Sequence, residues 1–298
     1  MAKAEPENFV TGAELDEPGL ESLLAHASEL KAGRDEGLGS DLLGGRSIGL
    51  VFELPSTRTK VSFEVGVSEL GAHPVVMRGD ELQLSRGESV ADTARVLSRY
   101  LHGIVIRSAS DESVAELAAE ADVPVVNALT PSNHPCQALA DLLTLRERFG
   151  SLDGLRVAYL GDGNNVARSL AVLGRTAGIE VVASSPEGLE LESGICELVG
   201  DPEQAVEGAD AIYTDVWVSM GNDADAADRR ALLEPYALTE RLMDLASPEA
   251  IALHCLPAHP GEEISAEVLY GPRSAVWDQA ENRLHAQKAL LAVLVNGR

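Results

Sequence analysis

Ile48-Gly49-Leu50-Val51-Phe52, followed closely by Pro55-Ser56-Thr57-Arg58-Thr59, is the stretch around which the rest of the chain can be placed. The apolar run predicts a buried strand, and the periodic residues after the hydroxyl groups predict a helix. The first N–H groups of a helix lack partners and lie at the positive end of its dipole, so they suit an anion. Arg58 adds a planar cation that matches phosphate. The stretch therefore predicts a phosphate site or, as the simpler alternative, a helix capped by Ser56 with a solvated Arg58.

The same strand-to-helix alternation continues along the chain. The predicted strands span 48–52, 73–77, 103–107, 123–127, 155–160, 179–183, 211–215 and 251–254. The predicted helices span 14–30, 89–101, 110–121, 135–149, 164–176, 228–246 and 279–295. Continuous apolar strands that alternate with helices indicate parallel sheets covered on both faces. We therefore expect an α/β fold of two doubly wound domains, each with a parallel sheet flanked by helices, joined by a closing hinge.

The length and a polar, glycine-containing segment indicate where the chain divides. A chain of 298 residues is long enough for about two domains. The alternation of strands and helices starts afresh after residues 150–154, which predicts the boundary there. The ligand of an open α/β sheet binds at the carboxyl ends of the strands, and the polar motifs described below all lie at such ends.

The charge is unusual, because 48 acidic residues face only 23 lysines and arginines and the formal net charge is −25. This charge repels nucleic acid and anionic membranes, so neither is an expected partner. The acidic residues are spread along the chain, which leads us to expect a protein adapted to high salt; an acidic protein without that adaptation is the alternative. An N-terminus without an apolar core and three widely spaced cysteines lead us to expect a cytoplasmic protein without a disulfide framework.

Polar residues follow two strands of the first half. Arg107 ends a strand and could bind a ligand or pair with Asp111. His134-Pro135-Cys136-Gln137 opens a helix, where a neutral imidazole is favoured and can donate to a carbonyl. His134 could instead be only a capping residue. Cys136 is expected to be a small buried residue, and Cys196 a structural residue of a helix-like segment.

Polar residues also follow the strands of the second half. Gly161-Asp162-Gly163-Asn164-Asn165 resembles a dinucleotide motif, but its third glycine is absent and the next strand lacks a following acid, so this indication is weak. An asparagine there could bind a carboxylate instead. Asp215 suits an amine. In His254-Cys255-Leu256-Pro257, successive side chains of an extended strand point apart, which argues against a direct imidazole–thiol pair.

Together these motifs resemble the carbamoyltransferases, and most closely the ornithine branch of that family. The motifs are Phe-Glu-Leu-Pro-Ser-Thr-Arg-Thr (52–59), Gln-Leu-Ser-Arg-Gly-Glu-Ser (83–89), His-Pro-Cys-Gln (134–137), Gly-Asp-Gly-Asn-Asn (161–165), Asp-Val-Trp-Val-Ser-Met-Gly (215–221), His-Cys-Leu-Pro (254–257) and Glu-Asn-Arg (281–283). Lys60 and Pro260 depart from the usual family residues. The resemblance implies that residues 1–149 with the C-terminal helix 279–298 bind carbamoyl phosphate and residues 150–278 bind ornithine.

The resemblance also implies a role for each motif. The implied carbamoyl phosphate-binding residues are Ser56, Thr57, Arg58, Thr59, Gln83, Arg107, His134, Gln137 and Arg283. The implied ornithine-binding residues are Asn165, Asp215, Ser219, Met220, Cys255 and Leu256. The implied catalytic residues are Arg107, His134, Asp215 and Cys255. His254 would support Asp215 and Cys255, and Gln83 would reach the site of a neighbouring subunit in a homotrimer.

The expected reaction is attack of the neutral side-chain amine of L-ornithine on carbamoyl phosphate, which gives L-citrulline and phosphate, or the reverse in arginine breakdown. Thr59, Arg107 and His134 would stabilise the oxyanion, and Asp215 with Cys255 would take the proton. No cofactor or metal is expected. The alternatives are transfer to another amine such as aspartate or a modified ornithine, a non-catalytic amino-acid or anion-binding protein, and, least favoured, a dehydrogenase.

Overall fold

A computed structural model describes residues 7–82, 87–218 and 226–296, which form two compact units. Unit 1 comprises Met1–Leu143 and Arg283–Arg298, and unit 2 comprises Thr144–Asn282. Both divisions fall within helices, namely α5 (Pro135–Phe149) and α11 (Val276–Asn296), so each of these helices contributes to both units.

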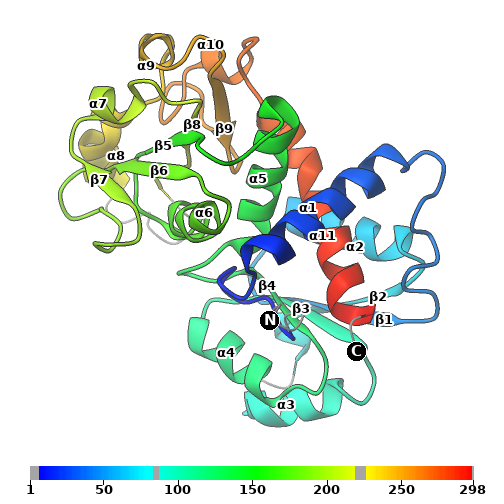
Figure 1. Ribbon diagram of the computed structural model, residues 1–298. Coiled ribbons are helices and arrows are strands. Elements are labelled where there is room, and N and C mark those ends of the chain that lie inside the picture. The colour runs from blue at the N-terminus through cyan, green and yellow to red at the C-terminus, as the bar shows by residue number, and fades with distance from the viewer. Residues whose placement is uncertain (1–6, 83–86, 219–225, 297–298) are drawn as a thin grey trace. The chain divides into compact units, whose positions relative to one another are not determined.

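Unit 1 contains a parallel sheet in the order β2-β1-β3-β4 (Figure 1). Its strands are β1 (Ser47–Phe52), β2 (His73–Arg78), β3 (Gly103–Arg107) and β4 (Val125–Leu129), and its other elements are α1 (Glu17–Ala32), α2 (Thr57–Glu69), η1 (Gly79–Glu81), α3 (Val90–Leu97) and α4 (Asp111–Glu120). Helices α1, α2 and α11 lie on one side of the sheet, and α3 and α4 lie on the other (Figure 1). A buried cluster that includes Val51, Ala94, Ile104 and Val114 joins the sheet to α3 and α4.

Unit 2 contains a second parallel sheet in the order β7-β6-β5-β8-β9. Its strands are β5 (Arg156–Leu160), β6 (Glu180–Ser184), β7 (Glu197–Val199), β8 (Ala211–Thr214) and β9 (Ile251–His254), and its other elements are α6 (Asn165–Thr176), α7 (Pro202–Val206), α8 (Ala226–Leu233), η4 (Glu234–Tyr236), α9 (Glu240–Leu245) and α10 (Ala266–Leu269). One face packs on α7, α9 and α10, and the other on α6, where Gly174 lies directly over Val181. The prediction of an α/β fold with two parallel sheets flanked by helices is confirmed.

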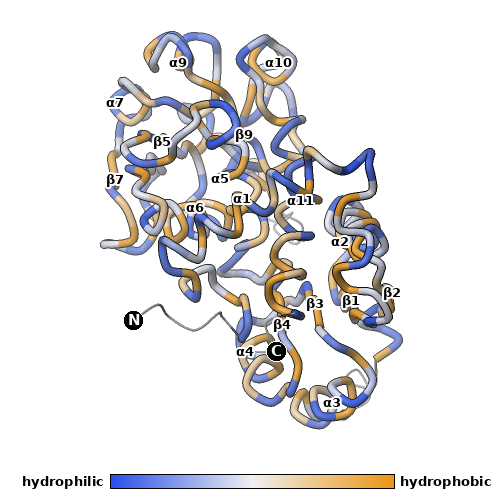
Figure 2. The backbone as a smooth tube through the Cα atoms, turned by 45° about the vertical axis from the view of Figure 1, so that its right-hand side comes forward, coloured by the Kyte–Doolittle hydropathy of each residue, from blue (hydrophilic) through white to orange (hydrophobic). Residues whose placement is uncertain are grey.

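Burial accounts for the sequence patterns that define these elements. Residues 48–52 of β1 are all buried, as a strand covered on both faces requires. Helix α3 alternates hydrophobic and hydrophilic residues (Figure 2), as a helix with one face on a sheet does. Among the residues that the structure describes, no helix combines the length and the apolar character needed to cross a membrane.

Two local predictions are wrong. The helix expected over 228–246 is interrupted, because α8 ends at Leu233, η4 follows, and α9 begins only at Glu240. Pro235 lies at the start of η4, where its missing N–H and fixed φ prevent a continuous helix. Cys196, expected in a helix-like segment, instead directly precedes β7.

Candidate functional site

The first turn of α2 differs from an ordinary helix start in its capping and in its charge. Ser56 occupies the N-cap position with extended backbone, but its side chain makes no capping hydrogen bond. The first turn contains no acidic residue and instead contains Arg58 and Lys60. Cations at a helix N-terminus are unfavourable unless an anion lies among them. The simpler alternative is confirmed in part, because Ser56 is the N-cap residue and Arg58 is exposed, although the Ser56 side chain accepts no capping hydrogen bond. The anion site itself stays a prediction.

Thr59 and Arg283 connect this turn to the C-terminal helix within unit 1. Thr59 is buried, and its hydroxyl accepts a hydrogen bond from Nη2 of Arg283 at 2.7 Å. Arg283 is itself only 3% exposed. Burying the charge of an arginine beside a helix N-terminus costs free energy unless a negative charge lies nearby. An anion bound next to Arg283 would offset that cost.

His134 lies within the same cluster of arginines. Its carbonyl accepts the N–H groups of Gln137 and Ala138, so His134 precedes the first turn of α5, as expected. Burial lowers the pKa of His134 well below its usual value, and the charges of Arg283, Arg107 and Arg58 lower it further. The imidazole is therefore neutral at physiological pH and can donate one hydrogen bond without adding charge.

Arg107 and Gln137 are the remaining predicted site residues of unit 1 that the structure describes. Arg107 ends β3, and the register between β3 and β4 shifts between Ile106 and Arg107, an irregularity that redirects a side chain at a strand end. The side chain of Gln137 is buried and donates to Asp141 at 2.9 Å. Asp141 was not predicted from the sequence. Its position one helical turn after Gln137 is the feature from which this contact could have been predicted.

Cys136 is structural. It is fully buried, and its thiol contacts the carbonyl of Asn127. Burial raises the pKa of Cys136 to about 12, which the charge of Arg283 only partly opposes. The thiol is therefore protonated and unreactive at neutral pH, in agreement with the prediction of a small buried residue.

In unit 2, Asp215 directly follows β8 and is 7% exposed. Its carboxylate accepts a hydrogen bond from the side-chain amide of Asn164 at 2.9 Å. Burial raises the pKa of Asp215, and the negative charge of Glu263 adds to that rise, whereas His254 and the hydrogen bonds from Val216 and Asn164 oppose it. An acid of this kind can hold or accept a proton at higher pH than an exposed carboxylate can.

Asn164 is a residue whose contact with Asp215 the sequence did not reveal. Its side-chain oxygen accepts from the N–H groups of Val166 and Ala167 and from the Tyr159 hydroxyl. These contacts cap α6 and leave the amide nitrogen directed at Asp215. Asn165, the asparagine predicted from the sequence, begins α6 and is half-buried.

His254 is held between two carboxylates of unit 2. Its Nδ1 accepts the Leu256 N–H at 2.8 Å and lies 4.0 Å from an Asp215 oxygen, and its Nε2 lies 3.2 Å from the buried carboxylate of Glu263. Because Nδ1 is an acceptor, the ring proton is assigned to Nε2, which donates to Glu263. The hydrogen bond from Leu256 also holds that residue at a φ of +62°, which only glycine adopts readily. His254 thus shapes the turn that contains Cys255.

Burial alone would raise the pKa of Glu263, but hydrogen bonds from His254, from the His259 N–H and within its own backbone lower it overall. Glu263 is fully buried and was missed in the sequence. The one sequence feature that could have indicated Glu263 is its position nine residues after His254, beyond the end of a strand.

The glycine loop that resembled a dinucleotide motif is closed by the chain itself. The N–H of Gly163 donates to the carbonyl of Leu189 at 2.7 Å, and a Cβ at Gly163 would lie 2.5 Å from the backbone nitrogen of Leu191. A pyrophosphate needs such backbone N–H groups to be accessible. The dehydrogenase alternative is therefore not supported.

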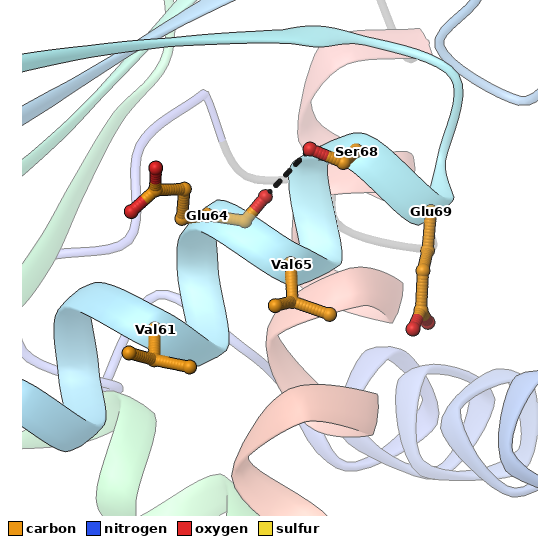
Figure 3. Close-up of a pocket in the computed structure, with 5 residues that line it drawn as sticks. All are labelled: Val61, Glu64, Val65, Ser68 and Glu69. Atoms are coloured by element: carbon orange, nitrogen blue, oxygen red, sulfur yellow. Dashed lines mark hydrogen bonds between the residues drawn. The ribbon is translucent and has the colours of Figure 1, made fainter.

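Three of the predicted site residues, Gln83, Ser219 and Met220, lie outside the described residues. A separate open pocket of about 420 Å³ lies on α2 and is lined by Val61, Glu64, Val65, Ser68 and Glu69 (Figure 3). None of these five is a predicted site residue. No cluster of three or more His, Cys, Asp or Glu side chains in residues 7–82, 87–218 and 226–296 could hold a metal ion.

Comparison with known proteins matches two family models to successive parts of the chain. The family model described as the aspartate/ornithine carbamoyltransferase carbamoyl-P binding domain matches residues 7–147, and the model described as the Asp/Orn binding domain matches residues 153–294. An ornithine carbamoyltransferase of Symbiobacterium thermophilum is 48% identical over 309 residues, covering 99% of this chain and all of the relative. One of Methanoculleus marisnigri is 47% identical over 300 residues, covering 97% of both chains.

Solved structures agree with the sequence relatives. Ornithine carbamoyltransferase from Pyrococcus furiosus superposes with a TM-score of 0.95 at 43% identity, and the match covers both chains completely. The enzyme from Thermus thermophilus superposes with a TM-score of 0.91 at 41% identity, covering 97% of this chain and 99% of the other. The resemblance found in the motifs is thus confirmed across both units, and the chain belongs to the aspartate/ornithine carbamoyltransferase family.

Proposed function

We propose that this chain transfers the carbamoyl group of carbamoyl phosphate to the side-chain amine of L-ornithine, which gives L-citrulline and phosphate. The observation that carries this proposal is the first turn of α2, where Thr59 bonds the buried Arg283 and no acidic residue is present. A phosphate dianion offsets that concentration of positive charge. The names of the relatives favour ornithine over aspartate as the amine.

Carbamoyl phosphate binds to unit 1 in this proposal. Ser56, Thr57, Arg58 and Thr59 hold the phosphate group with the free N–H groups of the helix. The neutral imidazole of His134 donates to the carbamoyl oxygen, and Arg107 stabilises the negative charge that develops there during attack. Because the pKa of His134 is already low, its donation does not depend on protonation across the neutral range.

Ornithine binds to unit 2 in this proposal, and its reacting amine must first lose a proton, since a lysine-like amine has a pKa of about 10. Asp215 accepts or holds that proton, a role that suits a carboxylate whose pKa is raised by burial. Cys255 and Leu256 lie in the turn shaped by His254 and flank the amine. Asn165, Ser219 and Met220 remain proposed contacts of the amino-acid end.

A homotrimer in the cytoplasm, with Gln83 reaching a neighbouring subunit, is the expected assembly and belongs to this proposal. Sedimentation of the purified chain measures the assembly directly. Enzymes that make citrulline and enzymes that break it down differ in cooperativity and partners, so initial rates measured in both directions test which direction this chain favours.

Replacement of Arg58 by glycine tests the proposal. Arg58 is exposed, so its loss should leave the fold intact while carbamoyl phosphate binding falls by at least about 100-fold and citrulline synthesis is lost. Lys60→Gly, in the same turn, controls for the cost of glycine in a helix. Citrulline synthesis retained by Arg58→Gly would sink the assignment.

A further inference from the structure

We propose that Arg229 is a positioning residue for the amine-binding side of unit 2, because its guanidinium joins the loop after β5 to the loop after β8. This inference rests on the proposed function. Arg229 lies in α8, and its side chain is 19% exposed. It was not singled out from the sequence, and it contacts none of the proposed substrate-binding side chains among the interactions described above.

Two contacts give the arginine this position. Its Nε donates to the backbone carbonyl of Trp217 at 2.6 Å, and its Nη2 forms an ion pair with the carboxylate of Asp162. Trp217 lies two residues after Asp215, and Asp162 lies two residues before Asn164. One planar guanidinium thus contacts both loops, with its N–H groups directed at two acceptors at once.

The loops joined by Arg229 are the loops that bring Asn164 and Asp215 together. Their side chains meet at 2.9 Å. The indole of Trp217 packs on Gly161, where a Cβ would lie 3.7 Å from the indole nitrogen. Loss of the guanidinium would release the Trp217 carbonyl and shift Asp215 relative to Asn164, without touching any group of unit 1.

The charge of Asp162 depends on this contact. Burial raises the pKa of Asp162, and the charge and hydrogen bond of Arg229 oppose that rise. Without the guanidinium, the protonated acid would be favoured, and it would accept hydrogen bonds less strongly. Both partners are therefore needed to fix the geometry of the two loops.

Arg229→Lys is the sharpest test, because it keeps the charge and loses the planar pair of donors. We expect the KM for ornithine to rise about tenfold or more, with the KM for carbamoyl phosphate changed less than about twofold. Arg230→Lys, in the same helix, is the matched control, since Arg230 is exposed and pairs with Glu262, so its replacement should leave both constants unchanged. Asp162→Asn should also raise the KM for ornithine, and the double variant should show less than the sum of the two effects.

The outcomes separate this inference from the proposed function. If the unmodified chain forms no citrulline, the proposed function fails and this inference fails with it. If the unmodified chain is active and Arg229→Lys behaves like Arg230→Lys, only the positioning role is overturned. Equal rises in both KM values, or a loss of kcat with a lower unfolding temperature and no selectivity for ornithine, would show a merely structural arginine and would equally overturn it.

Discussion

In both units most of the proposed substrate residues follow parallel strands, but the charged residues of the two sets have opposite sign. In unit 1, Arg58, Arg107 and Arg283 surround a neutral His134. In unit 2, the acids Asp215 and Glu263 flank His254. The same type of sheet therefore presents a cationic set of groups in one unit and an anionic set in the other. The fold fixes where ligands bind, and a few side chains at strand ends decide which charge is bound.

Burial acts differently on the two sets. It lowers the pKa of His134 and so keeps a donor neutral beside cations, whereas it raises the pKa of Asp215 and so keeps a carboxylate able to take a proton. Each shift suits a different task, donation to a developing oxyanion in unit 1 and proton removal from an amine in unit 2. Variants that alter one unit should therefore leave the binding properties of the other unchanged.

Asp215→Asn should have the largest effect among the variants of unit 2. Loss of the proton acceptor should lower kcat for citrulline synthesis by about 100- to 10,000-fold.

Because the folded pKa of Asp215 is raised above the unfolded value, its contribution to stability is present at low pH and lost as pH rises through the folded pKa. The asparagine variant should therefore be more stable than the unmodified chain at pH 7. Thermal unfolding measures this, and a destabilised variant would contradict the shift; Asp244→Asn, at an exposed ion pair, is the control.

Glu263→Gln should have a smaller effect, which appears as a change in pH dependence. The negative charge of Glu263 raises the pKa of Asp215, so removing the charge should lower that pKa. The acid limb of the rate profile should then move to lower pH, while the carbamoyl phosphate affinity stays the same. The measurement is the rate at saturating substrates across pH 4 to 8. An acid limb that does not move, or moves upward, would separate Glu263 from the amine-binding groups.

Salt should have the smallest effect on the sites and a general effect on the fold. A net charge of −25 repels itself, and molar salt shortens the screening length to about 3 Å. If the chain is adapted to high salt, its unfolding midpoint should rise between about 0.1 and 2 M KCl. The short contact between Thr59 and Arg283 is buried and should not respond. A midpoint that does not rise would remove the idea of salt adaptation.

Many of the elements and candidate site residues in this comparison could be predicted from the sequence, because the residues at strand ends form recognisable patterns. The run 48–52 and the hydroxyl residues after it indicate a strand and a helix, which the structure confirms, and an anion site, which stays a prediction. His134 before a proline-initiated helix, and Asp215 after an apolar strand, were identified in the same way. These signals are local, so the sequence alone reveals them.

The residues that the sequence did not reveal act through contacts distant along the chain. Asn164 reaches Asp215 across 51 positions, and Arg229 reaches Asp162 across 67. In the sequence, Glu263 is one of 48 acidic residues and nothing distinguishes it from the others. In the structure, its buried contact with His254 distinguishes it. The broken helix between α8 and α9 was missed because Pro235 was given too little weight against the periodic residues around it.

Calorimetric titration of carbamoyl phosphate into Asp215→Asn tests the central claim most directly, because the claim assigns the anion to unit 1 alone. The account predicts that this variant binds carbamoyl phosphate as tightly as the unmodified chain does, although it makes almost no citrulline. Loss of carbamoyl phosphate binding in Asp215→Asn would contradict the account, because the two sets of side chains would then not act on separate substrates.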